Sequence, residues 1–197
     1  MDMLIEGYAF WKALQEAQHS DSLVMTFGRF NPPTIGHRWL FQQMLNIATR
    51  ERAEAFVFTS HSQDKKKNPL SYVEKCELVS KLLPRGVRLV RTNARNMIEI
   101  VKEIAGYNRF RKLIVVVGDD RLESFSWIDK SKEEFGFTKV ELKSAGARSG
   151  ASNIQNASAT ALRNAAKAGD MEAFMNYSPF DAKTSEKVFN IIKERLK

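Results

Sequence analysis

The sequence contains little cysteine and histidine: one Cys, Cys76, and three His in 197 residues. A single cysteine excludes a disulfide framework, and so few cysteines and histidines argue against a structural zinc site. The apolar runs are short, such as Leu113–Val117, whereas a membrane-spanning helix needs about 20 residues. The first six residues carry two acidic side chains and no basic one, which argues against a secretory signal. We therefore expect a cytoplasmic protein without membrane attachment.

The charge is unbalanced, with 31 Lys and Arg against 23 Asp and Glu, a formal net charge of +8. Such a surplus attracts polyanions, whether nucleic acid, anionic lipid or nucleotide. It also serves solubility. Charge alone leaves these alternatives open.

The length predicts one main domain, which we place over residues 21–170, with an N-terminal helical extension (1–20) and a helical tail (171–197). Apolar strands alternate with amphipathic helices. The predicted strands are 23–27, 55–59, 87–91, 112–117 and 138–142, and the predicted helices are 1–19, 36–50, 72–83, 94–105, 122–129, 160–168, 171–176 and 184–196. This alternation is typical of an α/β fold with a parallel sheet, whose ligands bind beyond the carboxyl ends of the strands.

The loop after the first predicted strand runs from Gly28 to His37 and reads GRFNPPTIGH. Its glycines permit a tight backbone path and its prolines stiffen it. His37 falls in the first turn of the next helix, where backbone N–H groups and the helix dipole favour an anion. A histidine there can donate a hydrogen bond to a phosphate oxygen. The alternative is that His37 only occupies a helix start.

This loop resembles the signature of the nucleotidyltransferase superfamily, His or Thr, any residue, Gly, His, here Thr34-Ile35-Gly36-His37. The preceding residues, Gly28 to Pro33, are most similar to nicotinamide-nucleotide adenylyltransferases. The resemblance implies a Rossmann-like, doubly wound parallel sheet. It also implies that this loop lies along a nucleoside triphosphate, with the final His at the attacked phosphate.

A second segment, Ala157-Ser158-Ala159-Thr160-Ala161-Leu162-Arg163, resembles the family's Ile-Ser-Ser-Thr-any-Ile-Arg motif. Three positions differ, while Ser158, Thr160 and Arg163 match. Hydroxyls and backbone N–H groups at a helix start, with a guanidinium one turn later, form a sound phosphate site. Taken alone, Ser158 is better explained as a helix N-cap.

Two further segments are similar to the nicotinamide-nucleotide enzymes. The first runs from Ser60 through Lys65–Lys67 and Asn68-Pro69 to Lys75, where the family has a catalytic Arg; lysine keeps the charge but loses the bidentate geometry. Lys65–Lys67 either closes over the triphosphate or is a solvated charge run. The second is Gly118-Asp119-Asp120 with Trp127, which the family's pattern places near the ribose or ring of the acceptor, although Trp127 also fits a plain core position.

The resemblance therefore implies an adenylyltransferase of NAD biosynthesis: ATP or another nucleoside triphosphate reacts with a small phosphorylated acceptor such as nicotinamide mononucleotide. Mg²⁺ would be carried with the triphosphate, with no separate protein metal site. The sequence leaves a homo-oligomer open. The expected catalytic residues are His37, Thr34, Lys75 and Arg163; the expected nucleotide-binding residues are Gly28, Arg29, Phe30, Asn31, Gly36, Ser158 and Thr160; the expected acceptor-binding residues are Ser60, Asn68, Asp119, Asp120 and Trp127.

Three alternatives remain. A cytidylyltransferase is the nearest, although the Ser158-to-Arg163 segment fits the adenylyl branch better. A nucleic-acid-binding protein on the same fold is the second, because Arg109-Phe110-Arg111-Lys112 interleaves an aromatic with cations; part of that stretch also leads into the central strand. A non-catalytic assembly protein is the third.

Overall fold

The computed structural model describes residues 12, 20–146 and 158–196. The predicted N-terminal helix over 1–19, apart from Lys12, and Ala157 of the second motif lie outside the described residues. The described chain divides into two compact units, each treated by itself below. The sheet unit comprises residues 20–28, 40–60 and 83–146, and the helical unit comprises 29–39, 61–82 and 158–196.

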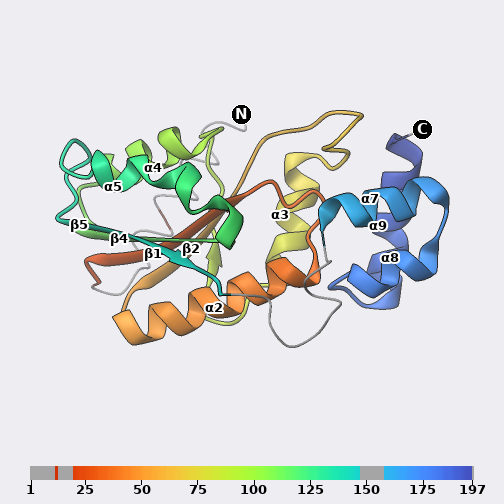
Figure 1. Ribbon diagram of the computed structural model, residues 1–197, viewed down its shortest axis with the longest axis horizontal. Coiled ribbons are helices and arrows are strands. Elements are labelled where there is room, and N and C mark those ends of the chain that lie inside the picture. The colour runs from red at the N-terminus through yellow and green to blue at the C-terminus, as the bar shows by residue number, and fades with distance from the viewer. Residues whose placement is uncertain (1–11, 13–19, 147–157, 197) are drawn as a thin grey trace. The chain divides into compact units, whose positions relative to one another are not determined.

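The sheet unit is built on five parallel strands in the order β3-β2-β1-β4-β5 (Figure 1). The strands are β1 (Ser22–Gly28), β2 (Glu54–Thr59), β3 (Arg88–Leu89), β4 (Lys112–Val117) and β5 (Lys139–Ser144). The register sets Gly28 opposite Thr59 and Val117 opposite Ser144, so these strands end at one edge. The predicted α/β class and parallel sheet are confirmed, although β3 is shorter than the predicted strand over 87–91.

Helices lie on both faces of the sheet: α4 (Met97–Gly106) and α5 (Trp127–Lys130) on one, and α2 (Ile35–Glu51) on the other (Figure 1). The main core joins alternate side chains of the strands, such as Met25 and Val115, to Ile100 of α4 and Ile128 of α5. Because β1 and β4 are covered on both faces, they read as continuous apolar runs in the sequence.

The prediction of a single helix over 122–129 is wrong. Two 3₁₀ turns, Asp119–Arg121 and Glu123–Phe125, precede the short α5. The turns are held by hydrogen bonds between residues three apart, such as the Arg121 N–H donating to the Gly118 carbonyl at 2.9 Å. Serines in this stretch are weak helix formers, and the turns bury Phe125 in the main core. Tertiary packing therefore overrides the helical pattern.

The helical unit contains α3 (Tyr72–Ser80), α7 (Ala159–Ala168), α8 (Met171–Tyr177) and α9 (Ala182–Arg195). Side-chain N-caps begin each of them, and Gly169 ends α7 in the left-handed conformation with φ 77°, as a C-terminal glycine favours. Apolar side chains including Leu78, Leu162 and Phe189 form a second core. The three predicted tail helices are confirmed, and α3 ends earlier than predicted.

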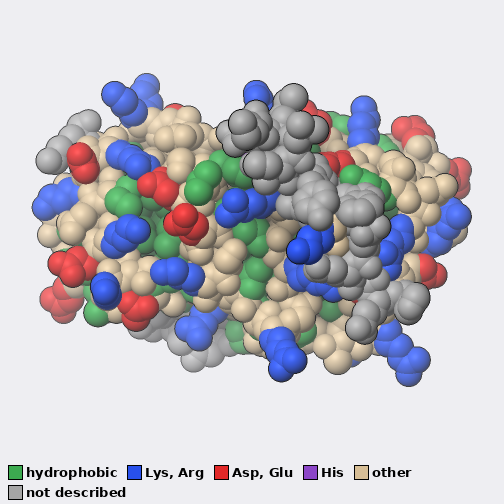
Figure 2. Space-filling model, turned by 180° about the vertical axis from the view of Figure 1, so that it is seen from behind, with side chains coloured by type: hydrophobic (Ala, Val, Ile, Leu, Met, Phe, Trp, Pro, Cys, Tyr) green, Lys and Arg blue, Asp and Glu red, His purple; other side chains and the backbone are tan. Residues whose placement is uncertain are grey.

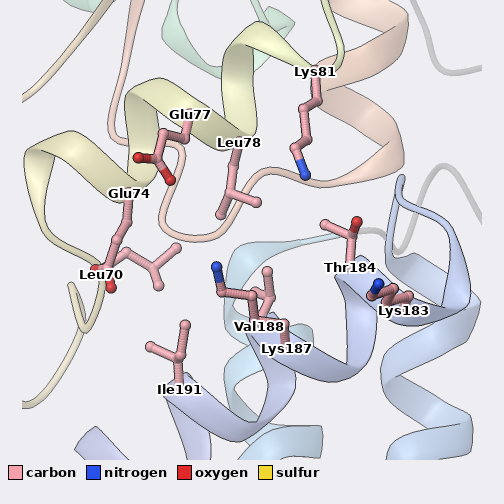
Figure 3. A pocket seen from close by; sticks show the side chains of 10 residues that line it. All are labelled: Leu70, Glu74, Glu77, Leu78, Lys81, Lys183, Thr184, Lys187, Val188 and Ile191. Atoms are coloured by element: carbon pink, nitrogen blue, oxygen red, sulfur yellow. The ribbon is translucent and has the colours of Figure 1, made fainter.

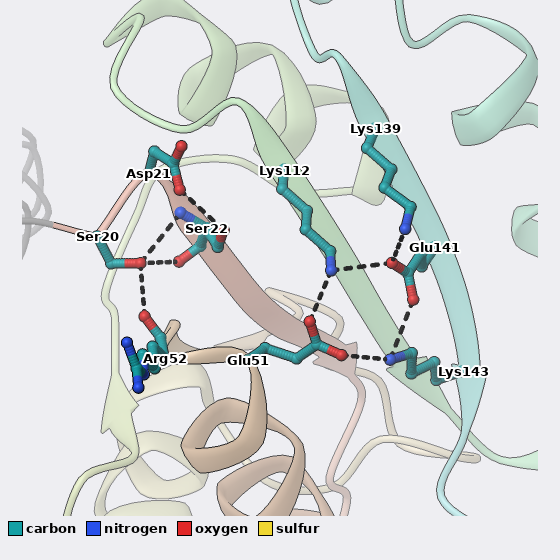
Figure 4. Close-up of polar contacts among 9 residues, drawn as sticks. All are labelled: Ser20, Asp21, Ser22, Glu51, Arg52, Lys112, Lys139, Glu141 and Lys143. Carbon is teal, nitrogen blue, oxygen red and sulfur yellow. Dashed lines mark hydrogen bonds and ion pairs between the residues drawn. The ribbon is translucent and has the colours of Figure 1, made fainter.

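A network of ion pairs joins the start of β4 to β5 and the end of α2 (Figure 4). Lys112 lies 2.7 Å from Glu51 and 3.0 Å from Glu141, and Lys143 lies 3.0 Å from each of the same two carboxylates. Lys112, the last residue of the basic stretch 109–112, is thus engaged by acidic side chains and begins β4.

On the face shown in Figure 2, Lys and Arg side chains are spread out, with Asp and Glu side chains among them.

Glu141→Gln should remove a pH-dependent part of the stability. Hydrogen bonds from Lys139 and Lys112, and then Lys143, lower the pKa of Glu141 from 4.5 to about 2. Because the folded-state pKa is below the unfolded one, this stabilisation is present above about pH 4.5 and is lost as the pH falls towards 2. Urea unfolding at several pH values should show a shallower acid loss in Glu141→Gln than in wild type. Equal slopes would contradict the prediction.

Candidate active site

The segment that carries the first motif leaves the sheet at Gly28, the end of its middle strand. The chain connects β1 to β2 on one side of that strand, whereas β4 pairs with it on the other. In open parallel sheets, ligands bind at the carboxyl end of the strands where the order reverses in this way. The motif therefore begins at the expected position for a ligand-binding loop.

Thr34 and His37 contact each other within this loop. The Thr34 N–H donates to His37 Nδ1 at 2.9 Å, and Thr34 Oγ1 lies 3.1 Å from the same nitrogen. Because Nδ1 accepts a backbone hydrogen bond, the neutral imidazole carries its proton on Nε2. The ring also packs edge-on against Phe30, with 4.9 Å between centroids. Thr34 thus orients His37 in the first turn of α2 and makes Nε2 a hydrogen-bond donor.

Asn31 connects the loop to two other segments of the helical unit. Its side chain donates to the Leu70 carbonyl at 3.1 Å and accepts from the Leu70 N–H at 2.9 Å. Its own carbonyl accepts a hydrogen bond of 2.7 Å from Arg163 Nη1. The first and second motifs, which lie far apart in the sequence, are therefore in direct contact at Arg163.

Arg163 interacts electrostatically with a second cation, Arg29, and with one carboxylate, Asp64. Its Nη2 donates to Thr160 Oγ1 at 3.0 Å, which holds the guanidinium against the start of α7. Burial and then the charge of Arg29 lower the pKa of Arg163, while Asp64 acts in the opposite direction. Two guanidinium groups that repel each other favour the binding of an anion between or beside them. Arg29 is exposed and Arg163 half-buried, so a ligand in solvent can approach them.

The lysine-rich stretch forms a turn closed by Asp64. The backbone N–H groups of Lys66 and Lys67 donate to Asp64 Oδ1 at 2.8 and 2.6 Å, and the Asn68 side chain donates to Oδ2. These hydrogen bonds hold the pKa of Asp64 well below its usual range. Lys65, Lys66 and Lys67 are exposed on this turn. Asn68, predicted to bind the acceptor, is buried and uses its amide to close the turn.

Lys75 is fully buried in α3, and its Nζ donates to the Ser62 carbonyl at 2.8 Å. This contact ties α3 to the segment that precedes the lysine-rich turn. Burial lowers the pKa of Lys75 to about 8. The contact to Ser62 gives Lys75 a role in holding this segment. A direct role of Lys75 at the phosphates stays a prediction.

Lys75→Met should flatten a rise in stability at alkaline pH. Because the pKa is about 8 in the folded protein and 10.5 ordinarily, the unfolded chain binds more protons between these values, and the free energy of unfolding rises with pH there. Urea unfolding from pH 7 to 10.5 should show this rise in wild type and in Lys81→Met, an exposed lysine of the same helical unit, but not in Lys75→Met. A rise that persists in Lys75→Met would contradict the prediction.

The remaining residues of the second motif begin α7. The Ser158 hydroxyl accepts from the Ala161 N–H at 3.0 Å, so it is the N-cap of the helix. Thr160 is exposed and contacts Arg163. Gly36 is buried in the first turn of α2.

Five predicted residues belong to the sheet unit: Gly28, Ser60, Asp119, Asp120 and Trp127. The Ser60 N–H donates to the Gly28 carbonyl at 2.9 Å, so these two residues are adjacent at the edge where β1 and β2 end. Asp119 contacts the Ser144 hydroxyl at the end of β5, and Asp120 is exposed beside it. Trp127 packs against the main core and Phe135, as the plain core interpretation expects.

The sequence analysis did not predict Leu70 as a site residue, nor did it predict the cavity that Leu70 lines. The cavity, of about 440 Å³, lies between α3 and α9 (Figure 3). Leu70, Leu78, Val188 and Ile191 supply its apolar lining, and Glu74, Glu77 and three lysines its charged rim. No predicted site residue lines it. Leu70 enters the site only through its backbone groups, which no side-chain pattern reports.

Fold and loop together define the class: a parallel α/β protein with a histidine at the helix start after its middle strand. A family model described as cytidylyltransferase-like matches residues 25–189. The chain therefore belongs to the cytidylyltransferase-like family of nucleotidyltransferases. This result confirms the superfamily predicted from the sequence.

One solved structure that is similar to the chain shares its fold. A candidate nicotinate-nucleotide adenylyltransferase from Vibrio parahaemolyticus is 19% identical, with a TM-score of 0.55 over 86% of this chain and 99% of that one. Thermotoga maritima TmcAL bound with alpha-thio ATP is 10% identical, with a TM-score of 0.48 over 89% of this chain and 56% of that one. No curated protein matches the chain significantly in sequence. Among the described residues, no helix is long and apolar enough to cross a membrane.

Proposed function

We propose that the protein transfers the adenylyl group of ATP to a small phosphorylated acceptor, nicotinamide mononucleotide being the first choice, and releases pyrophosphate. The observation that carries the proposal is the contact of the two motifs: His37 is oriented by Thr34, and Arg163 binds the loop at Asn31. A donor for the attacked phosphate and a cation for the leaving pyrophosphate thus lie in one unit.

The proposed reaction needs no general base, because the attacking phosphate oxygen of the acceptor is already ionised near neutral pH. That oxygen forms a bond to the α-phosphorus of ATP, and the bond from this phosphorus to the bridging oxygen of pyrophosphate breaks. His37 Nε2 would donate to an α-phosphate oxygen, where charge develops in the transition state. Arg163 and Thr160 would bind the leaving pyrophosphate. Such catalysis depends on alignment and on neutralising charge.

Mg²⁺ is part of the proposal as a companion of the triphosphate. Among the described residues, no group of three or more His, Cys, Asp and Glu side chains could hold a metal ion. Asp64, the carboxylate that acts on Arg163, already accepts hydrogen bonds from its own turn. Phosphate oxygens would therefore provide most of the ligands, and the ion would neutralise their charge.

The adenine base and the pyridine acceptor are supported by resemblance. Gly28 to Pro33 is similar to nicotinamide-nucleotide adenylyltransferases, and the Vibrio parahaemolyticus structure of the same fold bears a related name. The family description favours a second candidate, transfer from CTP. The two differ only in the base of the donor, so one assay separates them.

The test is pyrophosphate release from each of the four nucleoside triphosphates with a panel of acceptors. We expect ATP with nicotinamide or nicotinate mononucleotide to give the highest rate. Activity with CTP and another phosphorylated acceptor would replace the adenylyl assignment and keep the family mechanism. No release with any pair, together with oligonucleotide binding that weakens steeply with salt, would favour the nucleic-acid-binding alternative. If the protein neither releases pyrophosphate nor binds a nucleotide, the result favours a non-catalytic assembly protein.

A further inference from the structure

Asn31 is buried, with a relative exposure of 2%, and its side-chain amide is used within the protein. Both hydrogen bonds of that amide go to the backbone of Leu70, one from its N–H and one to its carbonyl. The geometry differs from that of a residue that reaches towards a nucleotide. It is that of a bridge between the loop 29–39 and the segment that leads into α3.

The same residue sets the position of Arg163. The Asn31 carbonyl accepts a hydrogen bond of 2.7 Å from Arg163 Nη1, and Thr160 Oγ1 accepts one of 3.0 Å from Nη2. Both terminal nitrogens of the guanidinium therefore have a defined partner, and only one of those partners lies on the helix of Arg163 itself. The direction of the Asn31 carbonyl depends on the backbone of its loop, which the two bonds to Leu70 hold in place.

We propose that Asn31 is a positioning residue, which aligns the Arg163 guanidinium for a phosphate ligand through its carbonyl while its amide locks the loop to Leu70. This inference rests on the proposed function, since it takes Arg163 as a phosphate-binding group. It assigns Asn31 an indirect role instead of the nucleotide contact that the sequence predicted. A buried amide that pairs with a backbone N–H and C=O together is hard to replace, because an apolar side chain satisfies neither group and a carboxylate cannot donate to the carbonyl.

The test is calorimetric binding of inorganic tripolyphosphate, a probe that needs neither the base nor the acceptor. The variants are Asn31→Ala, which removes both bonds, Asn31→Asp, which sets a carboxylate against the Leu70 carbonyl, Arg163→Ala, and the double variant Asn31→Ala with Arg163→Ala. Asn96→Asp is the matched control, because it makes the same change of charge at the N-cap of α4 in the sheet unit, where Asp also caps well. Urea unfolding of every variant shows that it is folded under the binding conditions.

We expect Asn31→Ala and Asn31→Asp each to weaken tripolyphosphate binding by about tenfold, the effect of one misplaced charged hydrogen bond. Asn96→Asp should bind like wild type, and the double variant should bind no more weakly than Arg163→Ala. This lack of additivity is a readout that a merely structural role would not produce. Wild-type affinity in both folded Asn31 variants, or additive losses in the double variant, would overturn the positioning role and leave the proposed function intact. Tripolyphosphate binding that is absent, or unchanged in Arg163→Ala, would overturn the phosphate role of Arg163 and the inference with it.

Discussion

His37→Ala should lower the turnover number by about 10²–10³-fold, the usual loss when one donor to a transition-state oxygen is removed. The loss follows from the position of the imidazole: Thr34 occupies Nδ1, so Nε2 is the nitrogen that carries the donor hydrogen. KM for the triphosphate should change much less, because the developing charge is largest in the transition state. Steady-state pyrophosphate release measures both constants.

Two nearly isosteric variants separate the two ring nitrogens. His37→Asn places a side-chain oxygen where Nδ1 accepts from Thr34 but has no group at the position of Nε2. His37→Gln can place its amide N–H near Nε2. We expect His37→Gln to retain more activity than His37→Asn, and both to unfold in urea close to wild type. Equal turnover in wild type and His37→Ala would remove the proposed mechanism.

Arg163→Ala should lower kcat/KM for the triphosphate by about 10–100-fold, as expected for the loss of a charge-assisted hydrogen bond to phosphate. Inhibition by the product pyrophosphate should weaken in parallel, since the same guanidinium would hold it. Arg163→Lys should recover part of the loss because it keeps the charge, but it cannot contact Asn31, Thr160 and a phosphate with a planar fork.

Lys167→Ala is the control for Arg163. Lys167 lies one turn further along α7, is exposed and carries the same charge, so its removal tests the general attraction of a basic helix. We expect Lys167→Ala to change kcat/KM by less than about threefold, because exposed charges are strongly screened. If Arg163→Ala and Lys167→Ala behave alike, the second motif has no specific role at the phosphates.

Short-range features could be predicted from the sequence with good accuracy. The strand predicted over 112–117 has these bounds in the structure as β4, which lies between β1 and β5. The helix predicted to end at residue 168 does so, with Gly169 as its C-cap, and Ser158 caps its start. Each of these depends on apolar runs or on hydrogen bonds between residues three or four apart, which the local sequence encodes.

The prediction of a helix over 122–129 was wrong because long-range packing, and not the local sequence, decides the structure there. Its residues show enough apolar spacing for a helix, but burial of Phe125 and Ile128 in the core of the sheet unit takes precedence. Asn31 and Lys75 illustrate the same limit in the candidate site. The resemblance predicts Asn31 as a nucleotide-binding residue and Lys75 as a catalytic one, and both direct their side chains to backbone groups, of Leu70 and Ser62.

By itself, the sequence determined the parallel α/β class, the loop that ends in His37 at a helix start, and the superfamily that this loop resembles. Only the tertiary structure decided how the site is assembled. Asn31 meets Leu70 across 39 positions and Arg163 across 132. Hydrogen bonds of this kind depend on how distant segments pack, and they use backbone groups that every residue except proline has. A side-chain pattern can identify a phosphate-binding loop, but the partner that orients its arginine follows only from the folded chain.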